Sequence, residues 1–199
     1  SCGRGVYVHS GPEIAVASTK AFTSQTGALL VAALMFGRTR LLSPHEGKAL
    51  GEELLKIPDK ISSYLKNPGP IQSAIELLTA GKFAFFFGRG VSAAVAMEGA
   101  LKLKEVAYIP CMPYPAAEMK HGPIALIDSS TPVVAIVPDD MMRDKTLSNV
   151  QEVKARGAKI ILIHSEGDHE SPRLADVAIA VPRAPALRRL DHAVRLEDP

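Results

Sequence analysis

The last two thirds of the chain alternate short apolar runs with stretches of helical periodicity. Four apolar runs are typical of strands buried on both faces: 82–88, 132–138, 159–165 and 177–182. The stretches with helical periodicity are 71–80, 91–109 and 144–158. Strands that alternate with helices predict a three-layer α/β/α fold around a parallel sheet.

The first third of the chain predicts one strand and two long helices. The aromatic and β-branched run 6–9 predicts the strand. Residues 20–36 predict a helix that ends at Gly37 and is apolar on nearly every face, so we expect it to be buried. Residues 45–66 predict an amphipathic helix that Pro58 kinks or splits.

The sequence Asn-Pro-Gly-Pro at 67–70 is the strongest interruption of the pattern, and we place a domain boundary there. Residues 1–66 are then the end of one domain with connecting helices, and residues 67–199 form a second domain. The tail of this second domain, 183–199, carries charge and has little periodicity.

Composition excludes several classes of protein. The 199 residues are 47% hydrophobic and 22% charged, as in ordinary soluble globular proteins, and the net charge of +2 gives no support for a nucleic-acid partner. No apolar run reaches the ~18 residues of a membrane span, and the first residues do not resemble a signal peptide. Cys2 and Cys111 form neither a disulfide framework nor a metal cluster, which fits the reducing cytoplasm.

The helix predicted at 91–109 carries the most informative charged residues. Glu98, Lys102 and Glu105 are spaced i, i+4 and i+7, so they share one face. A solvated charged stripe is the simpler interpretation of this spacing. Gly99 and Ala100, however, permit close packing or a close ligand. A lysine one turn from a carboxylate stabilises its ionised form, which can abstract a proton beside a carbonyl group.

Two further segments are candidates for chemistry. His121 follows Lys120 and precedes the rigid pair Gly122-Pro123, and an imidazole held in this way is suited to proton transfer, although a surface turn is the simpler alternative. The sequence Gly-Arg-Gly at 88–90 links a strand to a helix and either binds an anion or makes a tight turn; it matches no established phosphate motif. The remaining histidines have no metal-ligand spacing: His9, His45, His164, His169 and His192.

Three segments together carry a family resemblance. They are EIAVASTKAFTSQ (13–25), GRGVSAAVAMEGALKLKEVAYI (88–109) and AEMKHGPIALID (117–128). With these segments the chain resembles, over residues 11–182, the isomerase part of the glutamine–fructose-6-phosphate aminotransferases, a tandem of two sugar isomerase (SIS) domains with a flavodoxin-like fold. Such enzymes aminate fructose 6-phosphate with ammonia from a separate glutaminase domain and isomerise the product to glucosamine 6-phosphate.

The resemblance implies roles for individual residues. Glu105 matches the carboxylate that moves a proton between C1 and C2 of the sugar, Lys102 matches a lysine near the C2 oxygen, and Glu98 matches a carboxylate of the same site. His121 matches a histidine that assists ring opening in the site of a neighbouring subunit. Sugar-contacting positions are matched by Val16, Ala17 and Ser18. The resemblance therefore implies a homodimer that binds a sugar phosphate, with no metal ion or organic cofactor.

The chain also departs from the family pattern. The family's phosphate-binding loop lies upstream of the segment 16–19, and its glutaminase domain and that domain's cysteine nucleophile have no counterpart here. A lysine of the family's tail forms a Schiff base with the sugar, whereas this sequence has no lysine after Lys159. We expect the chain to be the end of the first SIS domain and most of the second, and to lack synthase activity by itself.

Three alternatives remain at this stage. The first is another SIS sugar-phosphate isomerase or a deglycase of fructosamine phosphates, which upstream sequence would distinguish. The second is a noncatalytic SIS module that senses sugar phosphates; the presence of both Glu105 and His121, and the lack of a helix-turn-helix segment, argue against it. The third is a structural α/β domain, for which three motif matches would have to arise by chance.

Overall fold

The chain folds into two compact units. The computed structural model describes residues 5–184, so Cys2 and almost all of the predicted tail lie outside the described residues. Among the described residues, one unit comprises residues 5–62 with residue 184, and the other comprises residues 63–183.

The second unit is built on a five-stranded, fully parallel sheet in the order β2-β1-β3-β4-β5. The strands are β1 (Ala84–Gly88), β2 (Cys111–Pro115), β3 (Pro132–Val137), β4 (Lys159–Ser165) and β5 (Val177–Val181). The helices are α3 (Ile71–Ala80), α4 (Val91–Ala107) and α5 (Arg143–Lys154), with the 3₁₀ helices η1 (Ala116–His121), η2 (Pro123–Leu126) and η3 (Ser171–Leu174). This strand order is that of flavodoxin-like folds.

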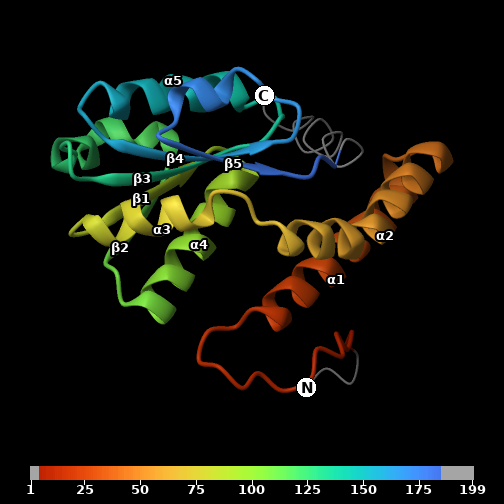
Figure 1. The fold of residues 1–199 in the computed structure, drawn as a ribbon. Helices are drawn as coiled ribbons and strands as arrows, with labels where there is room; N and C mark the ends of the chain where they lie inside the picture. The colour runs from red at the N-terminus through yellow and green to blue at the C-terminus, as the bar shows by residue number, and fades with distance from the viewer. Residues whose placement is uncertain (1–4, 185–199) are drawn as a thin grey trace. The chain divides into compact units, whose positions relative to one another are not determined.

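Alternation along each strand builds two cores, one on each face of the sheet. In β1, Phe85 and Phe87 enter one core, which α5 and η1 cover, while Ala84 and Phe86 enter the other, which α3 and α4 cover. Figure 1 shows α5 on one side of the sheet and α3 and α4 on the other. The three-layer α/β/α prediction is confirmed.

Most predicted elements of this unit are present, and β2 was not predicted. All four predicted strands exist, with ends that agree to within two residues. The additional strand, β2, contains Pro113 and Pro115, and within residues 5–184 it pairs only with β1. An edge strand bonds to one neighbour and tolerates residues that lack a backbone N–H, which is why this proline-containing segment extends the sheet.

The first unit corrects three predictions. Residues 6–9 are not a strand, because no strand among the described residues pairs with them and β propensity alone does not hold a strand in place. Helix α1 (Lys20–Arg40) continues past Gly37, and none of its residues is buried in the described chain. The apolar surface of α1 therefore has no complete cover here. None of the described helices is long and apolar enough to cross a membrane.

Local polar contacts fix the helix starts of this unit. Glu13 Oε1 accepts hydrogen bonds from the backbone N–H groups of Thr19 (3.1 Å) and Ala21 (2.9 Å) at the start of α1, and these bonds lower the pKa of Glu13. Ser43 and Glu46 form a reciprocal capping box at the start of α2 (Pro44–Lys66). Helix α2 continues through Pro58.

Candidate functional site

The turn from β1 into α4 depends on its two glycines. A Cβ atom on Gly88 would lie 2.6 Å from the backbone of Ser92, and Gly90 has a φ of 55°, which side chains disfavour. Arg89, between them, donates from Nε to Oδ1 of the buried Asn149 at 3.0 Å. The requirements of a tight turn therefore account for the Gly-Arg-Gly sequence.

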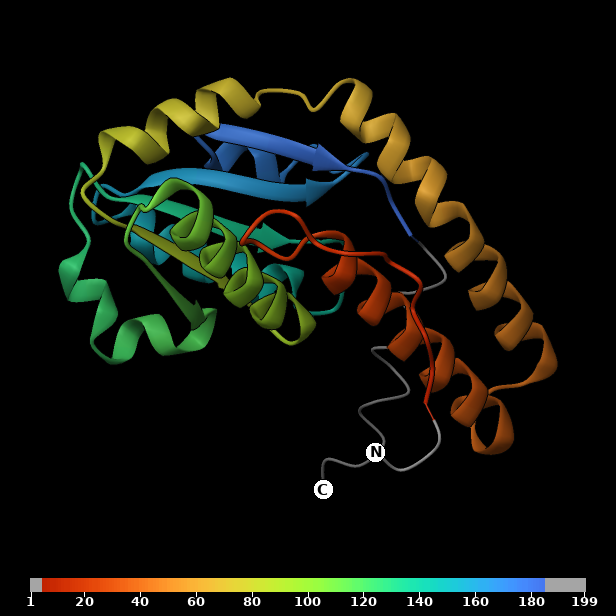
Figure 2. The same ribbon diagram turned by 90° about the horizontal axis from the view of Figure 1, so that it is seen from below.

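Small residues set one face of α4 against the sheet. A Cβ atom on Gly99 would lie 3.1 Å from the ring of Phe86, and Ala96 and Ala100 are fully buried. Cys111 of β2 donates from Sγ to the backbone carbonyl of Ala100 at 2.8 Å. Helix α4 contacts β1, β2 and β3, and Figure 2 shows it lying over this part of the sheet. Close packing, one of the two roles expected for Gly99 and Ala100, is observed.

The three charged residues predicted to share a face of α4 form one cluster. The ammonium group of Lys102 lies 3.2 Å from Glu98 Oε1 and 2.7 Å from Glu105 Oε2. Between 23% and 29% of each of these three side chains is exposed, so the cluster is neither buried nor fully solvated. We call Glu98, Lys102 and Glu105 the α4 triad.

The two carboxylates of the α4 triad stabilise the positive charge of Lys102. The hydrogen bond to Glu105 raises the pKa of Lys102, against the opposing effect of partial burial, and the bond to Glu98 adds to the rise. Lys102 is therefore a permanent cation at neutral pH. Glu105 Oε1 has no hydrogen-bond partner among the described residues. The triad thus presents a carboxylate oxygen able to accept a proton, beside a fixed positive charge.

His121 lies on the other side of the sheet from the α4 triad. It ends η1, whose Ala116 and Met119 are fully buried in the core shared with α5. Its own side chain is exposed, and Gly122, with a φ of 142°, ends the segment. No hydrogen bond or ion pair among the described residues connects His121 with α4. One copy of this unit does not bring together the two groups that the resemblance implicates in catalysis.

The predicted sugar-contacting residues Val16, Ala17 and Ser18 belong to the first unit, just before α1. Val16 is almost fully exposed, Ala17 is buried and Ser18 is half-buried. Because they lie in a different unit from the α4 triad, their relation to it remains a prediction.

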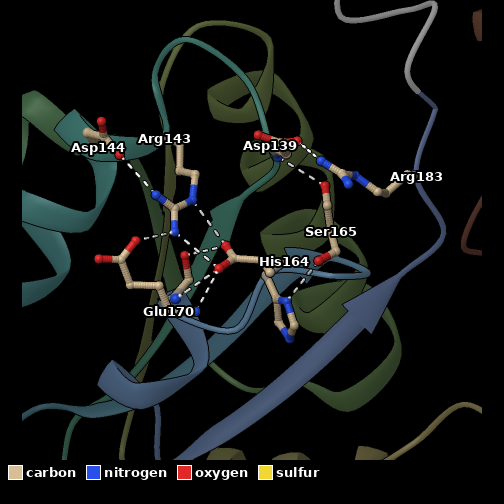
Figure 3. A network of polar contacts seen from close by, with 9 residues as sticks. Asp139, Arg143, Asp144, His164, Ser165, Glu170 and Arg183 are labelled. Atoms are coloured by element: carbon tan, nitrogen blue, oxygen red, sulfur yellow. Dashed lines mark hydrogen bonds and ion pairs between the residues drawn. The ribbon is translucent and has the colours of Figure 1, made fainter.

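A second polar network, which the sequence did not indicate, lies where β3 and β4 end (Figure 3). Arg143, at the start of α5, donates from Nε and Nη2 to the carboxylate of Asp168, both at 3.1 Å, and also pairs with Glu170 and Asp144. Asp168 accepts further bonds from the backbone N–H and hydroxyl of Ser171 and from the backbone N–H of Glu170. We call Arg143, Asp168, Glu170 and Ser171 the α5 clamp.

The α5 clamp is electrostatically saturated. Burial by itself would raise the pKa of Asp168, but the bonds from Arg143 and Ser171 outweigh it and hold that pKa far below its usual range. Nearby, Arg183 pairs with Asp139, whose backbone N–H donates to Ser165 Oγ at 3.0 Å. Arg143 and Asp168 are 25 positions apart in the sequence, so no helical or strand periodicity predicts their contact. Only the tertiary structure shows it. No group of three His, Cys, Asp or Glu residues in 5–184 is placed to hold a metal ion.

Two curated relatives show the similarity at sequence level. The chain is 46% identical over 182 residues to the glutamine–fructose-6-phosphate aminotransferase (isomerizing) of Chlorobaculum tepidum. It is 47% identical over 178 residues to the enzyme of the same name from Thermus thermophilus. These matches cover 92% and 89% of this chain, but it spans only about 30% of the length of each relative.

A solved structure shows the similarity at the level of the fold. The C-terminal domain of the glucosamine-fructose-6-phosphate aminotransferase from Francisella tularensis superposes with a TM-score of 0.81 at 38% identity. The match covers 89% of this chain and 51% of that one. Residues 77–189 match the family model of the SIS domain, which is more than half of the chain and includes the sheet, the α4 triad and His121. The chain belongs to the SIS domain family.

Proposed function

We propose that this chain is part of the isomerase portion of a glutamine–fructose-6-phosphate aminotransferase, which converts fructose 6-phosphate and glutamine-derived ammonia to glucosamine 6-phosphate. The observation that carries the proposal is the α4 triad, in which one ammonium group lies between two carboxylates at 3.2 and 2.7 Å. Its support is the similarity, at 46–47% identity, to enzymes named for this reaction.

The proposed chemistry is a proton transfer between neighbouring carbons. In the open-chain imine of the sugar, the Glu105 carboxylate takes the proton from C1, and the electrons move to form a C1–C2 double bond. Glu105 then returns the proton to C2, while the imine nitrogen takes up a proton and the C1 hydroxyl gives one up, so the product has an amino group at C2 and an aldehyde at C1. Lys102 lies beside the Glu105 carboxylate and stabilises negative charge that develops on the sugar, while Glu98 holds the ammonium group from the other side.

Further parts of the proposal concern groups outside the α4 triad. His121 assists ring opening, and its place on the opposite side of the sheet from α4 supports a role in the site of a second subunit. Val16, Ala17 and Ser18 contact the sugar. The homodimer, the glutaminase domain, the domain boundary at 67–70 and the cytoplasmic location are predictions from the same resemblance.

The test is glucosamine 6-phosphate formation from fructose 6-phosphate and glutamine by the full-length protein that contains this chain. Replacing Glu105 by Gln keeps the shape of the side chain and removes its charge, and we expect a loss in kcat of about 10²–10⁴-fold, the usual contribution of a catalytic base. Glu76→Gln is the matched control, because Glu76 is exposed on the neighbouring helix α3.

Three outcomes decide the proposal. Loss of activity in Glu105→Gln alone supports it. Equal activity of the two variants would show that Glu105 is not the base. A wild-type protein that deglycates fructosamine phosphates and makes no glucosamine 6-phosphate would assign the chain to another branch of the family.

A further inference from the structure

Tyr108, the residue directly after α4, has an unusual backbone conformation. The sequence predicted helix up to residue 109, but α4 ends at Ala107, and Tyr108 adopts the left-handed conformation with φ 56° and ψ 24°. Bulky side chains rarely take this conformation, because Cβ approaches the following carbonyl oxygen. The backbone of Tyr108 is therefore strained.

The helix end does not require a tyrosine. The backbone N–H of Tyr108 donates to the carbonyl oxygen of Lys104 at 3.2 Å and closes the last turn of α4. Any residue other than proline supplies this N–H, and glycine or asparagine would do so at lower conformational cost. The capping geometry accordingly explains the left-handed turn but not the aromatic side chain.

Packing within the described chain does not explain the side chain either. Tyr108 is 86% exposed, and its hydroxyl has no hydrogen-bond partner among the described residues. A large side chain that is strained and exposed gains little from the fold around it. Strained residues that local structure does not need collect at ligand sites, where another molecule provides the compensating contact.

The position of Tyr108 indicates which ligand its side chain would contact. It follows Glu105 by three residues, so it lies about one helical turn beyond the carboxylate of the α4 triad. Aromatic side chains commonly line the apolar part of a small-molecule site, while a few charged groups fix the orientation of the ligand. A sugar has such a dual surface, with an apolar C–H face and polar hydroxyl groups.

We infer that Tyr108 is a further substrate-contacting residue, whose ring packs against the C–H face of the sugar phosphate on which Glu105 acts. The inference rests on the proposed function, since it requires Glu105 to meet a sugar. It predicts a trade-off at this position: the tyrosine lowers the stability of the protein and improves substrate binding.

The experiment measures stability and kinetics in the same full-length protein. Tyr108→Gly and Tyr108→Asn relieve the strain, so we expect the melting temperature of the part that contains α4 to rise by about 2–4 °C. Both variants lose the ring, so KM for fructose 6-phosphate should rise about tenfold or more, with kcat changed by less than about threefold. Tyr108→Phe keeps the ring and should keep KM within about twofold.

A neighbouring residue provides the control. Val106 is also exposed, on the last turn of α4, and Val106→Ala should leave KM unchanged. If Tyr108→Gly leaves KM unchanged, the inference is wrong. A change in subunit association with unchanged KM would instead assign Tyr108 to a protein interface. A fall in the melting temperature of Tyr108→Gly would show that the ring packs within the protein, and would also overturn it.

Different experimental results would overturn the proposed function and the inference about Tyr108. A wild-type protein with no activity on fructose 6-phosphate would overturn both. Activity that depends on Glu105 but is unaffected at Tyr108 would overturn the inference alone.

Discussion

The second unit contains two ionic clusters that differ in how fully their charges are satisfied. In the α5 clamp, the carboxylate of Asp168 accepts five hydrogen bonds, from two nitrogens of Arg143, two groups of Ser171 and the backbone of Glu170. In the α4 triad, Glu105 accepts one hydrogen bond, from Lys102, within a single helix. Asp168 has therefore used its capacity to accept hydrogen bonds, whereas Glu105 retains most of its own.

This difference separates a structural from a chemical role. A saturated carboxylate has little left to offer a ligand, but it joins the start of α5 to the segment between β4 and β5. A carboxylate with one partner contributes less to stability, yet it has an oxygen that can still accept a hydrogen bond or a proton. Strong charge interactions therefore identify the clamp as a structural device, whereas incomplete satisfaction identifies the triad as the candidate site.

The largest effect on stability is expected in the α5 clamp. Asp168→Asn removes the negative charge that holds the partly buried Arg143, and we expect the free energy of opening of the second unit to fall by about 2–4 kcal/mol. Hydrogen exchange of the β4 and β5 amides in the full-length protein measures this quantity. Asp144→Asn is the control, because Asp144 pairs with the same arginine but is 91% exposed, and it should hardly change exchange. Similar losses in the two variants would contradict the comparison.

Acid should remove the contribution of Asp168. Its folded-state pKa is lowered, so the stabilisation is complete above the ordinary aspartate pKa of about 4 and is lost as pH falls below it. The difference in opening free energy between wild type and Asp168→Asn should thus be full at neutral pH and smaller at about pH 3. A difference that does not change with pH would mean that the charge of Asp168 is not what stabilises the clamp.

In the α4 triad, a substitution is expected to reduce activity more than stability. Lys102→Met removes the shared cation and keeps most of the apolar stem, so kcat/KM of the full-length protein should fall about 10–100-fold. Hydrogen exchange of the strand amides should change much less than in Asp168→Asn, since Lys102 makes its contacts within one helix. If stability fell as far as in Asp168→Asn and activity did not, the triad would be the structural cluster.

Local sequence patterns predicted the part of the fold that local forces decide. The four apolar strands were recognisable because burial on both faces selects continuous runs of Val, Ile and Phe. The edge strand β2 was missed because its prolines indicate a loop unless its position at the edge is known. The run 6–9 was predicted wrongly because a strand depends on a partner that its own sequence does not specify.

Local sequence patterns also predicted only part of the candidate site. Helical spacing was sufficient to place Glu98, Lys102 and Glu105 together, because residues three and four apart on a helix are neighbours. It could not show that His121 lies across the sheet, or that Arg143 meets Asp168, because the topology of the sheet decides both. The left-handed conformation of Tyr108 was also not predictable, since tyrosine has no preference for it.

The most direct test of the central claim is exchange of the C1 hydrogen of fructose 6-phosphate with deuterated water, followed by NMR in the full-length protein. This isolates proton transfer from ammonia delivery. The account predicts exchange by the wild type, a rate at least about 100-fold lower in Glu105→Gln, and an unchanged rate in Asp144→Asn. Exchange at the wild-type rate in Glu105→Gln would contradict the claim that the α4 triad is the chemical site.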